Sequence, residues 1–239
     1  MKSIKYNFFE KGYVRISSKG IKSDLIEIKK IFKNKFLKKF NTKLHNNNLN
    51  LITRFAGEPL IYKIINSAKL KKTINLLGIK EPVLTGPIVT HYTSNNDTSR
   101  SHGLDYHYDW NSMATSTKGI IVWFNINNFI KNNQFGLEVL EKSHNYFSNN
   151  SKNLFKNINL DKMKNTFKKI NLSVDDELLI MSTFLMHKTV RNNKINPNYW
   201  RLGISIRVDD LSDSIWKKNN YCSAYGNSVD RELYKKYKF

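Results

Sequence analysis

Apolar residues recur at helical spacing in the first third of the chain. After an alternating, strand-like segment at residues 12–16, the run that begins at Ser23 places apolar residues three and four positions apart behind an acidic first turn. These residues are Leu25, Ile28, Ile31, Phe32 and Phe36. A second helix is predicted over residues 59–77, with Leu60, Ile64, Ile65 and Leu70 on its apolar face. Both helices are expected to pack against a sheet.

From Pro82 onward the hydrophobic period changes to that of strands. Residues 119–126 form an almost continuous apolar run, which is typical of a strand buried on both faces. Further strands are predicted at residues 87–92, 136–140, 178–183, 185–189 and 201–208. A polar loop at 94–105 and an Asn- and Lys-rich segment at 147–170, expected to be a surface insertion with one helix, separate them.

Several short strands with turn signals between them favour a β-sandwich or barrel. The sequence contains no internal repeat and no clear domain boundary. We therefore expect a single domain over residues 1–239, with a helical part at about 20–80, a barrel at about 82–210 and a C-terminal extension at 211–239.

Composition narrows the classes of protein that fit. The 28.1 kDa chain is 40% hydrophobic, enough for a substantial core. Residues 1–14 offer no signal-peptide core, and no later stretch approaches the roughly 18 apolar residues of a membrane span, so a cytoplasmic protein without membrane insertion is expected. The single cysteine, Cys222, excludes a disulfide framework and a multi-Cys zinc site. Any metal ligands must therefore be His, Asp or Glu.

The net charge of +21 would ordinarily suggest a polyanionic partner. The Lys residues, however, accompany an equal excess of Asn and Ile, as in residues 33–50, and AT-rich codon usage produces that combination. No Arg-rich arm, zinc finger or aromatic nucleic-acid platform accompanies the charge. We therefore expect a solvated basic surface and no specific nucleic-acid partner.

His107, Tyr108 and Asp109 form an H-x-D element. In an extended segment, residues two apart point to the same side, so the imidazole and the carboxylate can bind one ion. His187, at the end of the apolar run 178–187, is the candidate third ligand from another strand. Two His and one carboxylate leave three octahedral positions open, as in non-haem Fe(II) oxygenases. H-x-D alone is common by chance, and a turn with a hydrogen-bonded Asp is the alternative reading.

The strand predicted at 201–208 alternates polar and apolar residues, with Arg201, Gly203, Ser205 and Arg207 on one face. A buried Arg requires an anionic partner, and a small diacid fits the guanidinium fork. A hairpin centred near residue 194 would place Arg201 opposite His187 and Arg207 roughly 20 Å further along. Arg201 is therefore expected to bind a diacid. Arg207 is expected either to contact the substrate or to have a structural role.

An ordered series of motifs carries a family resemblance over residues 8–208. The series comprises FFEKGYV at 8–14, HYDW at 107–110, VWFNI at 122–126, NNQFGLEVLEKSH at 132–144, DELLI at 176–180, His187 with Thr189 and Asn192, and Trp200 with Arg201. It resembles the phytanoyl-CoA dioxygenase-like branch of the Fe(II)/2-oxoglutarate oxygenases. Two features depart from the family: Glu141-Lys142 replaces the usual Pro-Gly, and the spacing from His187 to Arg201 is a few residues longer.

The resemblance implies a double-stranded β-helix, a jelly-roll or cupin-like barrel, buttressed by N-terminal helices. It also implies Fe(II) bound by the three candidate ligands, with 2-oxoglutarate and O2 as co-substrates and succinate and CO2 as products. The co-substrate site would include Arg201, Trp123, Thr189 and Tyr92. Related halogenases carry a small residue in place of the carboxylate ligand, so Asp109 favours hydroxylation.

The substrate is expected to be a small metabolite. Arg100 and His102 in the loop before the H-x-D element, together with Arg207, favour one with a carboxylate, phosphate or phosphonate. Tyr106 and Trp110 flank the element and either contact substrate or pack the barrel mouth. The alternative is a non-catalytic basic module of oxygenase fold that binds nucleic acid or an anionic surface. Retention of all three ligands and Arg201 argues against it.

Overall fold

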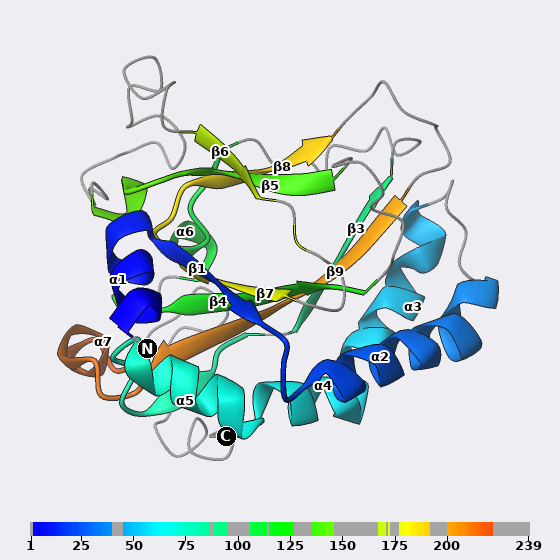
Figure 1. The fold of residues 1–239 in the computed structure, drawn as a ribbon, viewed down its shortest axis with the longest axis horizontal. Helices are drawn as coiled ribbons and strands as arrows, with labels where there is room; N and C mark the ends of the chain where they lie inside the picture. The colour runs from blue at the N-terminus through cyan, green and yellow to red at the C-terminus, as the bar shows by residue number, and fades with distance from the viewer. Residues whose placement is uncertain are drawn as a thin grey trace.

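The computed structural model describes residues 2–39, 45–86, 88–94, 106–113, 115–126, 135–145, 167–170, 172, 177–191 and 200–221. These residues form three layers: a small sheet, a large sheet facing it, and a layer of helices against the other side of the large sheet (Figure 1). The prediction of a mainly β fold flanked by helices is confirmed.

The large sheet has six antiparallel strands in the order β1-β7-β4-β9-β2, with β3 also paired to β9. Their bounds are β1 Tyr13–Ser17, β2 Pro82–Leu84, β3 Val89–Ser94, β4 Ile120–Asn125, β7 Glu177–Ser182 and β9 Trp200–Asp210. Every residue of β4 is buried because strands flank it and other layers cover both of its faces. The predicted doubly buried strand is confirmed.

The small sheet has the order β6-β5-β8, formed by Phe167–Ile170, Phe135–Leu140 and His187–Arg191. An isolated bridge between His107 and His187 adds the H-x-D segment beside β8. The strand β6 occupies the end of the segment expected to be an insertion, and residues 146–166 lie outside the described part of the chain.

The helical layer differs from its prediction in three places. The bounds are α1 Lys2–Lys11, α2 Lys22–Ile31, the π-helix η1 Phe32–Phe36, the 3-10 helix η2 Leu37–Lys39, α3 His45–Ala56, α4 Pro59–Ile65 and α5 Ala68–Leu76. A helix, α1, precedes the first strand, and α3 was not predicted. The single helix expected at 59–77 is wrong: Ser67 caps a new helix by accepting a hydrogen bond from the Leu70 amide.

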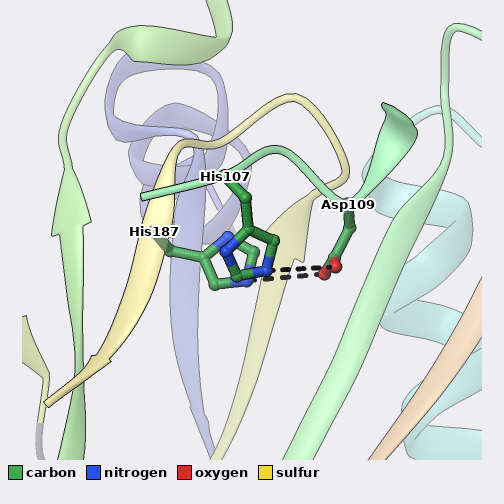
Figure 2. Close-up of side chains that lie close together, drawn as sticks. All are labelled: His107, Asp109 and His187. Carbon is green, nitrogen blue, oxygen red and sulfur yellow. Dashed lines mark ion pairs between the residues drawn. The ribbon is translucent and has the colours of Figure 1, made fainter. Parts of the chain in front are cut away.

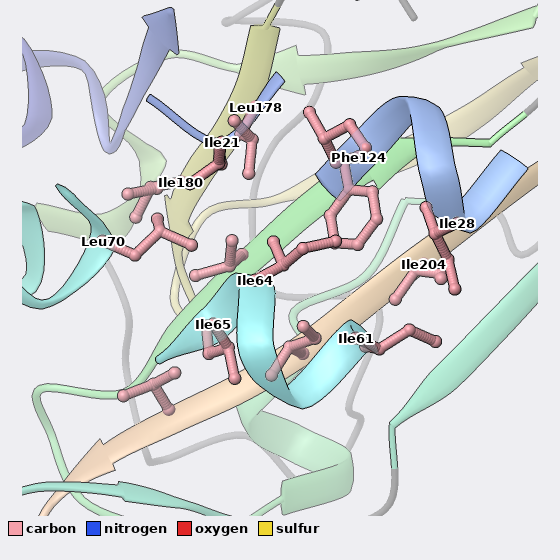
Figure 3. Packing of buried hydrophobic residues seen from close by; sticks show 14 of the residues in the cluster. Ile21, Ile28, Ile61, Ile64, Ile65, Leu70, Phe124, Leu178, Ile180 and Ile204 are labelled. Atoms are coloured by element: carbon pink, nitrogen blue, oxygen red, sulfur yellow. The ribbon is translucent and has the colours of Figure 1, made fainter. Parts of the chain in front are cut away.

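The main core lies between the helices and the outer face of the large sheet (Figure 3). Ile28 of α2 and Ile64 of α4 are fully buried there, against Phe124 of β4 and Ile204 of β9. A second core lies between the two sheets and includes Ile121, Trp123, Leu137, Val139, Leu179, Met181 and Leu185. Burying each large apolar side chain contributes about 1.5–3 kcal/mol, so both faces of the large sheet stabilise the fold.

The chain after β9 packs against strand β2 of the large sheet. Asp213 caps α7, Ser214–Lys218, by accepting a hydrogen bond from the Trp216 amide, and Trp216 packs with Val83 and Tyr221. Residues 222–239 of the expected C-terminal extension lie outside the described residues. Among the described helices, none is long and apolar enough to cross a lipid bilayer.

Candidate metal centre

His107, Asp109 and His187 converge between the two sheets (Figure 2). One potential ligand atom from each residue lies within 4.8 Å of the other two. The Asp109 carboxylate is 3.6 Å from His107 Nε2 and 3.5 Å from His187 Nε2. His187 is buried, and the side chains of His107 and Asp109 are 14% and 15% exposed. The cluster is therefore largely buried, and two of its three side chains keep some contact with solvent.

The backbone holds the two imidazoles side by side. His107 and His187 exchange both backbone hydrogen bonds, at 3.0 and 3.1 Å, and their ring centroids are 4.4 Å apart. The apolar run before His187 is not one strand: β7 ends at Ser182, a turn follows, and His187 begins β8 in the other sheet. This change of sheet carries His187 across to the H-x-D segment.

Hydrogen bonding and charge prepare the three side chains for a cation. The contact of His187 Nδ1 with the Leu185 carbonyl at 2.9 Å requires that Nδ1 donate, which leaves Nε2 with its lone pair facing Asp109. Burial raises the pKa of Asp109, but His187, His107 and Arg207 outweigh it and hold that pKa well below its usual range. Burial lowers the pKa of His187. An anionic carboxylate and neutral imidazoles are the forms that bind metal.

Arg201 lies on the face of β9 that points between the sheets, as predicted. It is 1% exposed, and its Nε and Nη1 have no hydrogen-bond partner among the described residues. Its guanidinium carbon is 4.8 Å from the centroid of the Trp123 ring, and burial lowers its pKa to about 10. Gly203 makes room for this ring, since a Cβ there would be 2.9 Å from Trp123 Cζ2. A buried cation with two unsatisfied donors is a ready anion site.

The hairpin that would place Arg201 opposite His187 is wrong. Strand β8 pairs with β5 in the small sheet, whereas β9 pairs with β2, β3 and β4 in the large one. Arg207 rather than Arg201 is the arginine whose charge acts on Asp109. Arg207 therefore lies within electrostatic reach of the metal cluster, while Arg201 extends from the same inward face of β9.

Other polar residues line the same interior. Thr189 shares its face of β8 with His187, since the two are paired with Leu137 and Val139 of the inter-sheet core. His91 Nε2 is 2.7 Å from Ser205 Oγ. Sequence reasoning missed the buried carboxylate of Asp209, which continues the inward alternation of β9 and accepts hydrogen bonds from the Ser116 amide and hydroxyl. Continuing the polar alternation of residues 201–207 by two positions would have predicted that Asp209 faces the interior.

Three expected site residues have other surroundings. Tyr92 is paired with Leu202 and lies in the core against the helices, on the opposite face of the sheet from Arg201, so its expected co-substrate role is not supported. Tyr106 packs on Phe167, 4.5 Å between ring centroids, with Lys188 Nζ 4.0 Å from its ring centroid. Because Lys188 and His187 are consecutive in a strand, Tyr106 faces away from the cluster.

Trp110 begins α6, Trp110–Met113, immediately after Asp109. Its ring stacks on Phe184, and its Nε1 donates a hydrogen bond to the Thr115 carbonyl at 3.3 Å. These contacts fix the segment that follows the carboxylate ligand, which fits the packing alternative better than substrate contact. Arg100 and His102 lie outside the described residues.

Several solved structures are similar to this one. EctD from S. alaskensis with 2-oxoglutarate and 5-hydroxyectoine has a TM-score of 0.64 at 13% identity, over 89% of this chain and 77% of that one. The epimerase SnoN in complex with Fe3+, alpha ketoglutarate and nogalamycin RO gives 0.58 at 11% identity, over 88% and 84%. AviO1 from Streptomyces viridochromogenes Tue57 gives 0.54 at 14% identity, over 89% and 96%.

These similarities establish the fold. The predicted double-stranded β-helix of the jelly-roll or cupin type, with N-terminal helices behind its large sheet, is confirmed. The sequence matches no protein-family model and no curated protein. The likeness is therefore one of architecture, and the argument for function rests on the side chains between the two sheets.

Proposed function

We propose that the protein is a non-haem Fe(II)- and 2-oxoglutarate-dependent dioxygenase, similar to the phytanoyl-CoA dioxygenase-like branch, that hydroxylates a small metabolite. One observation carries the proposal: a His-Asp-His cluster and a buried arginine with unsatisfied donors both lie between the two sheets. The similar EctD structure contains 2-oxoglutarate, and the similar SnoN structure contains Fe3+ and alpha ketoglutarate. They support the same pairing of metal and diacid here.

The cluster fits Fe(II) by its donor set and its tautomers. Two imidazole nitrogens and one carboxylate oxygen form the facial ligand set of Fe(II) oxygenases, which leaves positions for other ligands. The Leu185 carbonyl directs the Nδ1 proton of His187 away from the metal position. His107, Asp109 and His187 would hold the ion, with Arg207 helping to keep Asp109 ionised.

Arg201 fits the distal carboxylate of 2-oxoglutarate. Its guanidinium is fully enclosed, so an uncompensated charge there is costly until an anion arrives. Trp123 supports one side of the guanidinium, and Thr189 offers a hydroxyl on the facing sheet. A molecule with two carboxylates can satisfy Arg201 and the metal cluster together.

Iron with 2-oxoglutarate and O2 would supply the oxidising chemistry, converting the co-substrate to succinate and CO2 while one oxygen atom enters the substrate. The protein would contribute position and exclusion of water. Apolar side chains from both sheets, among them Leu137, Val139 and Leu179, enclose the interior and keep it dry. The carboxylate ligand Asp109 favours hydroxylation over halogenation.

An anionic substrate remains part of the proposal. Of the cations that suggested it, Arg207 is the one within the described residues, and it faces the inter-sheet space near Asp109. Acceleration of 2-oxoglutarate turnover by anionic metabolites, weakened in Arg207→Gln, would support this class of substrate. Acceleration by neutral compounds alone, unchanged in Arg207→Gln, would contradict it.

The metal site can be tested by titrating metal-free protein with Mn(II) in a calorimeter. His187→Ala should weaken binding by more than about 100-fold, because even residues that only orient a ligand cost 10–100-fold. Lys188→Ala is the matched control: the neighbouring side chain points away, toward Tyr106, and its loss should leave binding unchanged. Equal affinities in the two variants would contradict the cluster.

Turnover separates the oxygenase from a non-catalytic basic module of the same fold. Purified protein with Fe(II), O2 and pooled metabolites should convert 2-oxoglutarate to succinate, and Asp109→Ala should not. Metal binding without any 2-oxoglutarate binding or turnover would favour the module.

A further inference from the structure

The positive charge of this chain is concentrated in its helical layer. Residues 1–80 contain 19 Lys and Arg against 4 Asp and Glu, a net +15 of the total +21. Codon usage that favours Lys would act on every segment alike, so it does not explain why one third of the chain carries more than two-thirds of the charge. The uneven distribution of charge along the chain, unlike the total charge, therefore indicates a surface with a function.

The part of this charge that α2 to α5 carry lies on the side of the large sheet away from the metal cluster. The helices α2, α3, α4 and α5 cover the outer face of the sheet, and the cluster lies beyond its inner face (Figure 1). Substrate attraction at the cluster therefore does not account for the helical charge.

Three of the four acidic residues in this part of the chain form ion pairs with neighbouring lysines. Lys63 Nζ is 2.7 Å from Asp24, Lys35 Nζ is 3.3 Å from Glu58, and Lys30 Nζ is 3.6 Å from Glu27. The exposed side chains of Lys33, Lys38, Lys39, Arg54 and Lys72 form no ion pair with any described residue. After local pairing, a surplus of solvent-exposed cations remains on η1, η2, α3 and α5.

Two large apolar side chains of the same helical layer are also exposed. Ile26 of α2 is 39% exposed and Tyr62 of α4 is 41% exposed. Along α2 and η1, Lys22, Ile26, Lys30 and Lys33 follow one another at helical spacing and are all exposed. Helices α2 and α4 pack together, as the Lys63–Asp24 ion pair shows, so both exposed apolar side chains belong to the helical layer.

We propose that this surface, formed by α2, η1, η2 and α4, docks onto a lipid bilayer that contains anionic headgroups. Lys ammonium groups are attracted to such a surface, while isolated apolar and Tyr side chains enter the headgroup region. Residues 1–80 contain 17 Lys and only 2 Arg, whereas the bidentate contacts of sequence-specific nucleic-acid recognition favour the Arg fork. The docking is peripheral and independent of the oxygenase proposal.

The test is co-sedimentation of the full chain with vesicles of phosphatidylcholine alone or with one-third phosphatidylserine. Binding should require phosphatidylserine and decrease with salt. Lys33→Glu/Lys38→Glu/Lys39→Glu should weaken it by at least about tenfold. The control, Lys169→Glu/Lys217→Glu/Lys218→Glu, makes the same charge change at exposed lysines outside the helical layer and should cost less than about threefold.

A second variant distinguishes the bilayer from nucleic acid. Ile26→Ser/Tyr62→Ser should weaken vesicle binding and leave any binding of a labelled DNA duplex unchanged, because only the bilayer accepts apolar side chains. The proposal is overturned if vesicles with and without phosphatidylserine bind equally or not at all. It is also overturned if the two triple variants lose vesicle binding equally, or if duplex DNA binds more tightly than the vesicles.

Discussion

The two faces of strand β9 share one backbone and serve different purposes. The outer face, Leu202, Ile204, Ile206 and Val208, is fully buried against the helices. The inner face, Arg201, Gly203, Ser205, Arg207 and Asp209, is equally buried yet mostly polar or charged. Burial alone therefore does not distinguish structure from function in this strand. The distinguishing property is that the inner face buries charge, which costs stability unless a partner compensates it.

The largest expected effect on stability is at the outer face. Ile204→Ala should lower the free energy of unfolding by about 2–5 kcal/mol, because it leaves a cavity between β9 and the helices. Urea denaturation of the metal-free protein measures this. Ile215→Ala, at a position 57% exposed, should change stability by less than about 0.5 kcal/mol. Similar losses of unfolding free energy in both variants would show that the outer face of β9 is not part of the stabilising core.

Asp209 should make stability depend on pH at the inner face. Burial raises its pKa from 3.8 to about 6, so the folded state binds this proton more tightly than the unfolded state. Its contribution is complete below about pH 4 and is lost as the pH rises through 6, by at most about 3 kcal/mol. Asp209→Asn should flatten this part of the unfolding free energy against pH. An unchanged profile would assign the dependence to other groups.

Arg201→Met should show most clearly that the inner face of β9 binds a ligand whereas the outer face stabilises the fold. Removing an uncompensated buried charge should leave the free energy of unfolding unchanged or raise it. Binding of 2-oxoglutarate to the Mn(II)-loaded protein should weaken by more than about tenfold, because a charge-assisted hydrogen bond contributes about 1.5–3 kcal/mol. Loss of stability with unchanged 2-oxoglutarate affinity would make Arg201 a structural residue.

Gly203→Ala tests how closely the Trp123 ring packs against β9, and its expected effect is the smallest of the four. The added Cβ would meet Trp123 at 2.9 Å, so the ring and the guanidinium above it must shift. Overpacking of this kind should cost about 1 kcal/mol of stability and alter the intrinsic tryptophan fluorescence. Ser17→Ala, at an exposed position of β1, should leave the fluorescence unchanged. If both variants behave alike, the space at Gly203 has no special role.

Local patterns in the sequence predicted much of this arrangement. The alternation at 201–208 separated the two faces of β9, and the apolar run at 119–126 identified the central strand β4. The helices α1 and α3 escaped prediction because Asn and Lys interrupt their apolar positions, so packing rather than periodicity reveals them. Apolar residues keep their helical spacing on both sides of Ser67, so the pattern did not reveal that one helix ends there and that Ser67 caps the next.

The sequence by itself determined which side chains share a face, because alternation is a property of one extended strand and needs no knowledge of its neighbours. That was enough to pair His107 with Asp109 and Arg201 with Arg207. Only the tertiary structure decided which strands pair. In the tertiary structure, β8 and β9 belong to different sheets, and the charge of Arg207 rather than Arg201 acts on Asp109. Tyr92 and Tyr106 face away from the cluster. Strand pairing depends on contacts between distant segments, which no local period encodes.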